Sequence, residues 1–320
     1  MLIPEQEMEA KMGEHILVVG ATLLDVKGKP IDGLEPGTSN PGRIRSTRGG
    51  TARNVAENLA RLGADVVLIS AIGDDEIGRQ LLEQTAEAGV DVEEVCVQPG
   101  HHTGSYMAIL EIDGTLSVAL DDARVVECIT GQHLYQRRRL FRDAEMIMFD
   151  GSLSPGAIET TLKLAERYDI PIAADPSSAR LAYKLTPILS ALRLVVPNEV
   201  EAATLCGLDF LGHDVDASLD AARQLVRLGV DIGVVTLSDF GLAYATSDEN
   251  GYLPPRYSEM VDSTGTGDSV TAAILFGMLN GLPVTECMRL GAAAAGLTLQ
   301  THHTVVPNLS LDMLYDHLVV

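Results

Sequence analysis

The chain has 320 residues, of which 46% are hydrophobic, and its formal net charge is −22 at pH 7. This length suits one large α/β domain with an appendage or two small domains, and the apolar fraction is sufficient for a large core. A surface this acidic repels nucleic acid polymers and anionic membranes, so we expect neither as a partner. A small anion can still bind where the local potential is positive.

Cysteine usage and the N-terminal segment favour a cytoplasmic location. Cys96, Cys128, Cys206 and Cys287 lie far apart and form no Cys-x-x-Cys pair, which disfavours a zinc knuckle or redox motif and fits a reducing compartment. Residues 1–14 are acidic and lack the apolar core of a signal peptide. No apolar run is long enough to span a bilayer.

The first predicted elements are a strand, an irregular polar stretch and a helix. Residues 15–20 form an apolar run typical of a buried parallel strand, and Asp25 follows its carboxyl end, where ligands bind in open α/β sheets. A loop aspartate bonded to its own backbone explains Asp25 equally well. Residues 27–48 are rich in Gly and Pro and interrupt the α/β pattern. Gly49 and Gly50 then open a helix that ends near Gly63.

A second interruption and a regular α/β alternation follow. A strand is predicted at residues 66–72 and a helix at 76–88, and residues 105–120 form a hairpin around the Asp113-Gly114 turn. From residue 129 onward, strands alternate with helices, which indicates a mostly parallel sheet covered on both faces. The later predicted strands span residues 146–150, 171–175, 194–197 and 232–238, and the later helices span 155–168, 199–206, 217–228 and 285–299.

Residues 261–270, VDSTGTGDSV, contain the most informative motif of the chain. Apolar residues continue from it at helical spacing, so a helix with one inward face is predicted to begin near Gly267, with Asp268 in its first turn and Gly281 at its end. A glycine turn that leads into a helix N-terminus presents unpaired N–H groups to an anion, most often phosphate. An ordinary capped helix is the alternative. No Lys follows the glycines, so the motif is not a Walker A loop.

Two motifs carry a family resemblance. D-S-T-G-T-G-D at residues 262–268 resembles the D-T-T-G-A-G-D signature of the ribokinase-like (PfkB) carbohydrate and nucleoside kinases, with Ser263 and Thr266 as departures. G-G-T-A-R-N-V-A at residues 49–56 is similar to the first signature of that family. The order and spacing match, so the resemblance covers nearly the whole chain.

The resemblance implies a single α/β domain over residues 1–320, with three αβα layers and a mostly parallel central sheet. Insertions at about 27–48 and 92–120 would form a small β-sheet lid, which in this family often serves as a dimer interface. We therefore expect a homodimer through the lid.

The implied reaction transfers a phosphoryl group from MgATP to an alcohol. Asp268 would be the general base that accepts the hydroxyl proton. The N–H groups of Gly265, Thr266 and Gly267 would hold the phosphoryl oxygens. Asp25 and Asn54 match positions that hold sugar hydroxyls. The other candidates to contact the substrate are Gly49, Gly50, Ser39, Asn40, Thr103 and Tyr106.

The remaining matches concern nucleotide and ions. Asn198 and Glu201 match an N-x-x-E motif whose glutamate helps to hold hydrated Mg²⁺, although a helix cap with surface glutamates gives the same pattern. The resemblance places Thr236, Ser238 and Gly241, together with Asn198, Gly265 and Gly267, beside ATP. Asp262 and Thr264 match positions that bind a monovalent cation such as K⁺ in many relatives, and oxygen ligands suit such an ion.

The substrate is predicted from softer similarities. Residues 49–63, 38–42 and 304–310 resemble the pseudouridine kinase branch, whereas Leu181 stands where that branch tends to have lysine. The hypothesis is phosphorylation of the pseudouridine 5′-hydroxyl, with Ser39 and Asn40 contacting the uracil edge. Three alternatives remain: a kinase for ribose, another sugar or another nucleoside; an inactive nucleoside-binding or sensing protein; and an unrelated α/β protein.

Overall fold

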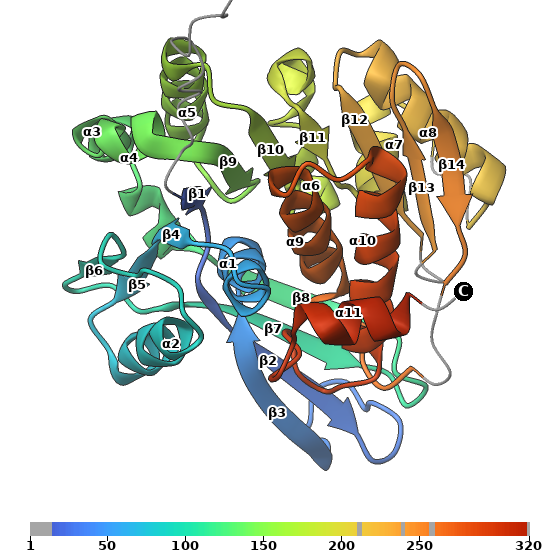
Figure 1. Ribbon diagram of the computed structural model, residues 1–320. Helices are drawn as coiled ribbons and strands as arrows, with labels where there is room; N and C mark the ends of the chain where they lie inside the picture. Colours follow the sequence, from blue (N-terminus) through green and yellow to red (C-terminus); the bar gives the residue numbers. More distant parts are fainter. Residues whose placement is uncertain (1–14, 210–212, 238–240, 256–259, 319–320) are drawn as a thin grey trace, which may run out of the picture.

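The computed structural model describes residues 15–209, 213–237, 241–255 and 260–318, and a sheet of eight strands forms its centre (Figure 1). Neighbouring strands are parallel except at the β12–β13 and β13–β14 pairs. From one edge to the other, the strands are β14 (Asn250–Leu253), β13 (Leu242–Ala245), β12 (Ile232–Thr236), β11 (Leu194–Val195), β10 (Ile172–Asp175), β9 (Ala144–Asp150), β1 (His15–Val19) and β4 (Val66–Ile69).

Helices cover both faces of this sheet. The side chains of β1 alternate between two apolar cores, with Ile16 and Val18 in one and Leu17 and Val19 in the other, because successive strand residues point to opposite faces. The first core is covered by α1 (Thr51–Arg61), α9 (Thr266–Leu279), α10 (Val284–Leu299) and α11 (Leu311–His317). The second is covered by α3 (Gly131–Gln136), α4 (Arg138–Asp143), α5 (Pro155–Tyr168), α6 (Ala179–Ala182), α7 (Glu199–Cys206) and α8 (Val215–Arg227). None of the described helices combines the length and apolarity needed to cross a membrane.

A second sheet of four strands stands below the main sheet in Figure 1, close to α1. Its order is β3 (Gly42–Gly49), β2 (Leu23–Pro30), β7 (Gly104–Leu110) and β8 (Leu116–Asp122). This arrangement confirms the predicted fold class, a mostly parallel αβα domain with an additional small sheet.

The predicted strand at residues 66–72 is in fact two strands, β4 and β5 (Ala71–Gly73), interrupted at Ser70. The Ser70 hydroxyl donates to the carbonyl oxygen of Gly20 and contacts the Thr22 hydroxyl. After this break, β5 pairs with β6 (Cys96–Gln98) in a separate two-stranded sheet. The segment around β6 therefore does not join the second sheet, contrary to the expectation for residues 92–120. The helix α2 (Glu76–Glu87) connects the two strands of this pair.

The helix α9 is buried on nearly all sides, whereas the sequence predicted one inward face. It lies between the main sheet, α1 and α10, so residues on its other faces also contact protein. The bounds predicted for α5 and α7 agree with the structure. Several short elements were not predicted, because too few residues carry their periodicity: α3, α4, α6, α11, β14 and the 3₁₀ segments Arg124–Cys128 and Thr186–Ala191.

Two glycines allow α1 to begin against β1 and β2. Gly50 has a φ of 93°, and a Cβ atom there would lie 2.3 Å from the carbonyl oxygen of Ala21. A Cβ atom on Gly49 would lie 2.0 Å from the Asp25 carboxylate. Glycine is therefore required at Gly50 both by its left-handed conformation and by the close approach of backbone.

We predict that Gly50→Ala lowers the free energy of unfolding by about 3 kcal/mol or more, because left-handed backbone strain adds to a steric clash. Gly63→Ala is the matched control, since Gly63 has a φ of 96° but a Cβ atom there would have no heavy atom within 4 Å. It should cost only about 1–2 kcal/mol. Urea titrations followed by circular dichroism measure both values, and equal losses would contradict the steric explanation.

Candidate active site

Polar side chains gather at the carboxyl ends of β1 and β9. The strand β1 pairs with β4 on one side and with β9 on the other. The chain therefore adds strands first on one side of β1 and later on the other, while these strands remain parallel. Ligands of open α/β sheets bind at such a switch point. The N-termini of α1 and α9 lie at the same end, because Asn54 of α1 contacts Asp268 of α9.

The contact between Asn54 and Asp268 joins the two sequence motifs across 214 residues. The Asn54 amide nitrogen donates to Asp268 Oδ2 over 2.5 Å. The amide oxygen of Asn54 accepts from the Arg53 guanidinium, which is fully buried. Arg53 in turn pairs with the fully buried carboxylate of Glu57. This chain of contacts fixes the amide orientation, so the Asn54 nitrogen faces Asp268.

Asp268 has an unusual protonation equilibrium. Burial raises the pKa of its carboxyl to about 7, and the carboxylates of Asp25 and Asp150 act in the same direction. The hydrogen bond from Asn54 and the charge of Arg53 oppose the rise. A carboxylate of this basicity can accept a proton from an attacking hydroxyl near neutral pH.

Asp25 lies on β2, opposite Tyr106 of β7 and Thr47 of β3. Its side chain is buried, and burial raises the pKa of the carboxyl to about 6, although Arg53 and Lys27 lower it. The charge of Asp25 also contributes to the raised pKa of Asp268, so the two carboxylates lie in the same region. A sugar bound here could donate one hydroxyl to Asp25 and lose the proton of a different hydroxyl to Asp268.

The turn before α9 has the geometry of an anion site. Gly265 is the N-cap of α9 with a φ of 80°, and a Cβ atom there would lie 2.0 Å from the carbonyl oxygen of Thr304. The first-turn amides of a helix of this length have no intrahelical partners and carry the positive end of the dipole. The Thr266 amide donates to Ser263 O over 3.3 Å, so it is partly engaged within the turn. Gly267 is exposed beside it.

Three further carboxylates surround this helix start. Asp175, at the end of β10, accepts from the Thr271 hydroxyl of α9, and its pKa is raised by burial and by Glu201 and Asp268. Burial also raises the pKa of Glu201 to about 7. Asp150 is fully buried at the end of β9. The described residues contain no set of three acidic, His or Cys side chains that could hold a metal by themselves. Magnesium would fit here only with phosphate and water ligands.

The expected nucleotide residues meet at the ends of β11 and β12. Asn198 and Glu201 form a capping box on α7, in which Glu201 Oε2 accepts from the backbone N–H of Asn198 and Asn198 Oδ1 accepts from the backbone N–H of Glu201. Asn198 bridges to Thr236, the last residue of β12. The cap of the alternative interpretation is therefore present, but Glu201 is buried and not a surface glutamate. Gly241 lies against the Tyr252 ring, whereas Ser238 lies outside the described residues.

Comparison with known proteins identifies the family. Residues 14–310 match the pfkB family of carbohydrate kinases. This chain belongs to that family. The kinase is 31% identical to the pseudouridine kinase of Escherichia coli over 93% of this chain and 94% of that protein. It is 28% identical to the guanosine-inosine kinase of Exiguobacterium acetylicum, over 93% and 99% of the two chains. It is therefore a phosphotransferase with an alcohol acceptor.

A solved structure shows the same fold. The ribokinase of Arabidopsis thaliana, complexed with ribose and ATP, superposes with a TM-score of 0.82 over 97% of this chain and all of that one, at 22% identity. This kinase therefore has the ribokinase-like architecture that its two motifs implied.

The remaining expected substrate residues of the kinase are spread over the second sheet. Tyr106 lies beside Asp25, and burial together with the charge of Asp25 raises the pKa of its hydroxyl. The Thr103 hydroxyl donates to Asp75 over 2.6 Å and accepts from the Gly73 amide, so it stabilises the start of α2. Ser39 is exposed, and the Asn40 amide binds the backbone of its own loop. That loop follows Pro30, roughly 17 Å along β2 from Asp25.

The structure adds residues that the sequence did not single out. Asp150, Asp175 and Arg53 are buried, and each contacts or influences a predicted site residue. Lys27 contacts the turn before α9. An aspartate as the last residue of a buried strand was the available signal for Asp150 and Asp175, but it becomes specific only when the strand order is known.

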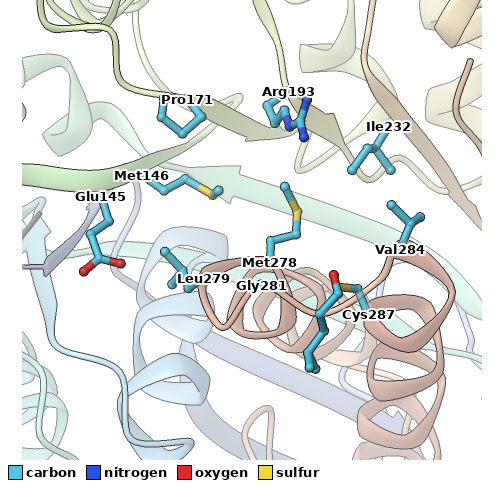
Figure 2. A pocket seen from close by; sticks show the side chains of 11 residues that line it. Glu145, Met146, Pro171, Arg193, Ile232, Met278, Leu279, Gly281, Val284 and Cys287 are labelled. Carbon is cyan, nitrogen blue, oxygen red and sulfur yellow. The ribbon is translucent and has the colours of Figure 1, made fainter. Parts of the chain in front are cut away.

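A separate cavity lies at the other end of the main sheet, where the parallel strands begin. It has a volume of about 430 Å³ and lies where β9 to β12 begin and α9 ends. Figure 2 shows Met146 of β9 and Met278 of α9 facing each other across it, with Glu145 and Arg193 at its sides. Because it is at the amino ends of the parallel strands, it is not the site around Asp268.

We predict that kcat/KM with saturating Mg²⁺ falls about tenfold per pH unit below about pH 7, because a base with a raised pKa is protonated there and cannot accept the hydroxyl proton. Asn54→Ala should move this midpoint to higher pH, since it removes a hydrogen bond that stabilises the carboxylate. Initial rates measured between pH 5.5 and 8.5 check both statements. A flat wild-type profile would exclude Asp268 as the titrating base.

Proposed function

We propose that this kinase transfers the γ-phosphoryl group of MgATP to the 5′-hydroxyl of pseudouridine. The main support is the contact between Asn54 and Asp268 at the N-terminus of α9, where a carboxylate with a raised pKa lies in the first turn of the helix. The relative named pseudouridine kinase and the similarity of residues 38–42, 49–63 and 304–310 to that branch support the choice of nucleoside.

The proposed step moves one proton and one phosphoryl group. The substrate hydroxyl oxygen forms a bond to the γ-phosphorus, and the bond from phosphorus to the β–γ bridging oxygen breaks, so that ADP leaves. Asp268 takes the hydroxyl proton, and the amides of Gly265, Thr266 and Gly267 stabilise the charge on the equatorial oxygens. Asp25 and Asn54 hold the ribose hydroxyls, for which Asn54 must share its amide between Asp268 and the sugar.

Magnesium would be held mainly by the ATP phosphates and by water. Glu201 is the proposed contact of one such water, since its Oε2 atom is engaged in the helix cap and the buried carboxylate retains one other oxygen. Thr236, Asn198, Ser238 and Gly241 are proposed to lie beside the nucleotide.

Recognition of the base is proposed to depend on hydrogen-bond acceptors on the sheet face that bears Asp25. Tyr106 and Asp121 are direct partners across β7 and β8, so Asp25, Tyr106 and Asp121 share one face of the second sheet. Pseudouridine has one more ring N–H group than uridine. An acceptor placed for that donor is left unpaired when uridine binds, which penalises uridine. Ser39 and Asn40 can contribute only if their loop folds toward this face.

A substrate panel tests the proposal. ADP release is measured with pseudouridine, uridine, guanosine, ribose and no acceptor, for the wild type and Asp268→Asn. We expect turnover with pseudouridine and a kcat for Asp268→Asn lower by roughly 10³-fold or more, with substrate binding largely retained. Turnover with ribose or guanosine but not with pseudouridine would support phosphoryl transfer and contradict pseudouridine as the substrate. Nucleoside binding without turnover would instead indicate a binding or sensing protein.

The outer face of the second sheet is the proposed dimer interface. It lies opposite the face that bears Asp25, and it exposes large apolar side chains. These are Ile44, Met107, Val118 and Leu120, which are between 46% and 81% exposed. Such a face on a monomer would be open to uncontrolled association, so we propose that a second copy of the chain covers it.

We predict that a double variant, Val118→Lys with Leu120→Lys, is monomeric while the wild type has twice the chain mass, because burying two ammonium groups in an apolar interface is unfavourable. Ile77→Lys on α2 is the control, since Ile77 is an exposed apolar side chain outside this sheet, at 43% exposure. Sedimentation equilibrium reports the mass of each protein. A dimeric double variant would place the interface elsewhere.

A further inference from the structure

Lys27 links the second sheet to the turn that begins α9. It lies on β2 two residues after Asp25, so both side chains are on the same face of the sheet. Its ammonium nitrogen is 2.6 Å from Asp262 Oδ1 and also contacts the Thr264 hydroxyl. The Lys27 and Asp262 side chains are each only 20% exposed. The pair is therefore largely shielded from solvent, where an ionic interaction is stronger than on an open surface.

Asp262 organises the turn through the same oxygen. Its Oδ1 atom accepts from the Thr264 amide over 3.0 Å and from the Thr264 hydroxyl over 2.8 Å. Together with Lys27, three donors converge on one carboxylate oxygen. Gly265 follows directly and caps α9, so the position of this carboxylate determines where the anion-binding amides begin.

The family resemblance led us to expect a monovalent cation such as K⁺ at Asp262 and Thr264. The side chains present do not fit that ion while Lys27 stays in place. Its ammonium group is itself a monovalent cation, and it occupies the oxygens on which the metal would depend. A second positive charge a few ångströms away would be repelled.

We propose that Lys27 supplies, from within the chain, the positive charge that a monovalent metal ion would otherwise provide at Asp262 and Thr264. The kinase then turns over without K⁺, and the second sheet is tied to the anion site by the same contact. This inference rests on the proposed phosphoryl transfer for its effect on rate, whereas the cation binding itself can be measured on the protein alone.

The variants follow from the geometry. Lys27→Met removes the charge and keeps much of the apolar stem, and Lys27→Arg keeps the charge. Lys29→Met is the matched control, because Lys29 is on the same strand and the same face and is exposed. All proteins are prepared in tetramethylammonium buffers, whose cation is too large for the site, and K⁺ is then added at constant ionic strength up to about 100 mM.

The expected rates show whether the site needs a positive charge and whether an added ion can replace the lysine ammonium group. The kcat of the wild type, Lys27→Arg and Lys29→Met should change less than about twofold when K⁺ is added, because a positively charged side chain at residue 27 already occupies the site in all three proteins. Without K⁺, Lys27→Met should lose roughly tenfold or more in kcat, since the turn before α9 carries an uncompensated carboxylate. Added K⁺ or NH₄⁺ should restore most of this loss along a saturable curve, and the larger Cs⁺ should restore less.

Thermal unfolding provides a readout that needs no substrate. Saturating K⁺ should raise the melting temperature of Lys27→Met and leave the melting temperatures of the wild type and Lys29→Met unchanged, because a ligand stabilises only the protein that binds it. This measurement still decides the inference if no nucleoside or sugar is phosphorylated, in which case the proposed function fails by itself.

Three outcomes would overturn the inference. Severalfold activation or thermal stabilisation of the wild type by K⁺ would mean that the ion binds beside Lys27. An unimpaired Lys27→Met that ignores K⁺ would mean that this charge has no role. An impaired Lys27→Met that no cation restores would reduce Lys27 to a structural tie between the second sheet and the turn.

Discussion

The buried carboxylate of Asp150 is the point on which the site depends. It accepts from the amides of Ala21 and Ala52 over 2.9 and 3.0 Å, and from the amide of Ser152 over 3.0 Å. These contacts join the exit of β1, the N-terminus of α1 and the turn after β9. The first of these segments leads to Asp25 and the second to Asn54, so one carboxylate sets the relative position of both. Gly20 leaves the space for it, because a Cβ atom there would lie 2.4 Å from the Asp150 carboxyl group.

The site gathers more negative charge than its surroundings can neutralise. Asp25, Asp175, Glu201 and Asp268 all have raised pKa values, and burial is the largest cause for each. These carboxyls lower the stability of the fold progressively as the pH rises from their ordinary pKa of about 4 through the raised values, because the unfolded chain releases these protons at lower pH. Arg53, Asn54 and the N-terminus of α9 offset part of this cost. Such an arrangement is expected where a protein must accept a proton and approach a cation-bound phosphate.

Sequence reasoning was strongest where glycine carried the signal. The motifs at residues 49–56 and 262–268 identified the fold class and the family, and the structure shows why Gly49, Gly50 and Gly265 stand there. It was weaker for side chains whose role depends on their contacts in the folded protein. Thr103 was expected to face a substrate, and its hydroxyl instead stabilises the start of α2. Asn198 and Glu201 form the cap that the pattern alone allowed, but Glu201 is buried and not at the surface.

The sequence by itself determined the α/β alternation, the glycine turn before α9 and the presence of Asp268 in its first turn, because each depends on residues close together in the chain. Only the tertiary structure decided that Asn54 meets Asp268, that Asp150 joins three segments and that Lys27 reaches Asp262 across 235 residues. These contacts are between residues that local periodicity cannot relate. Strand order and the position of the second sheet bring them together, and burial then sets their charges.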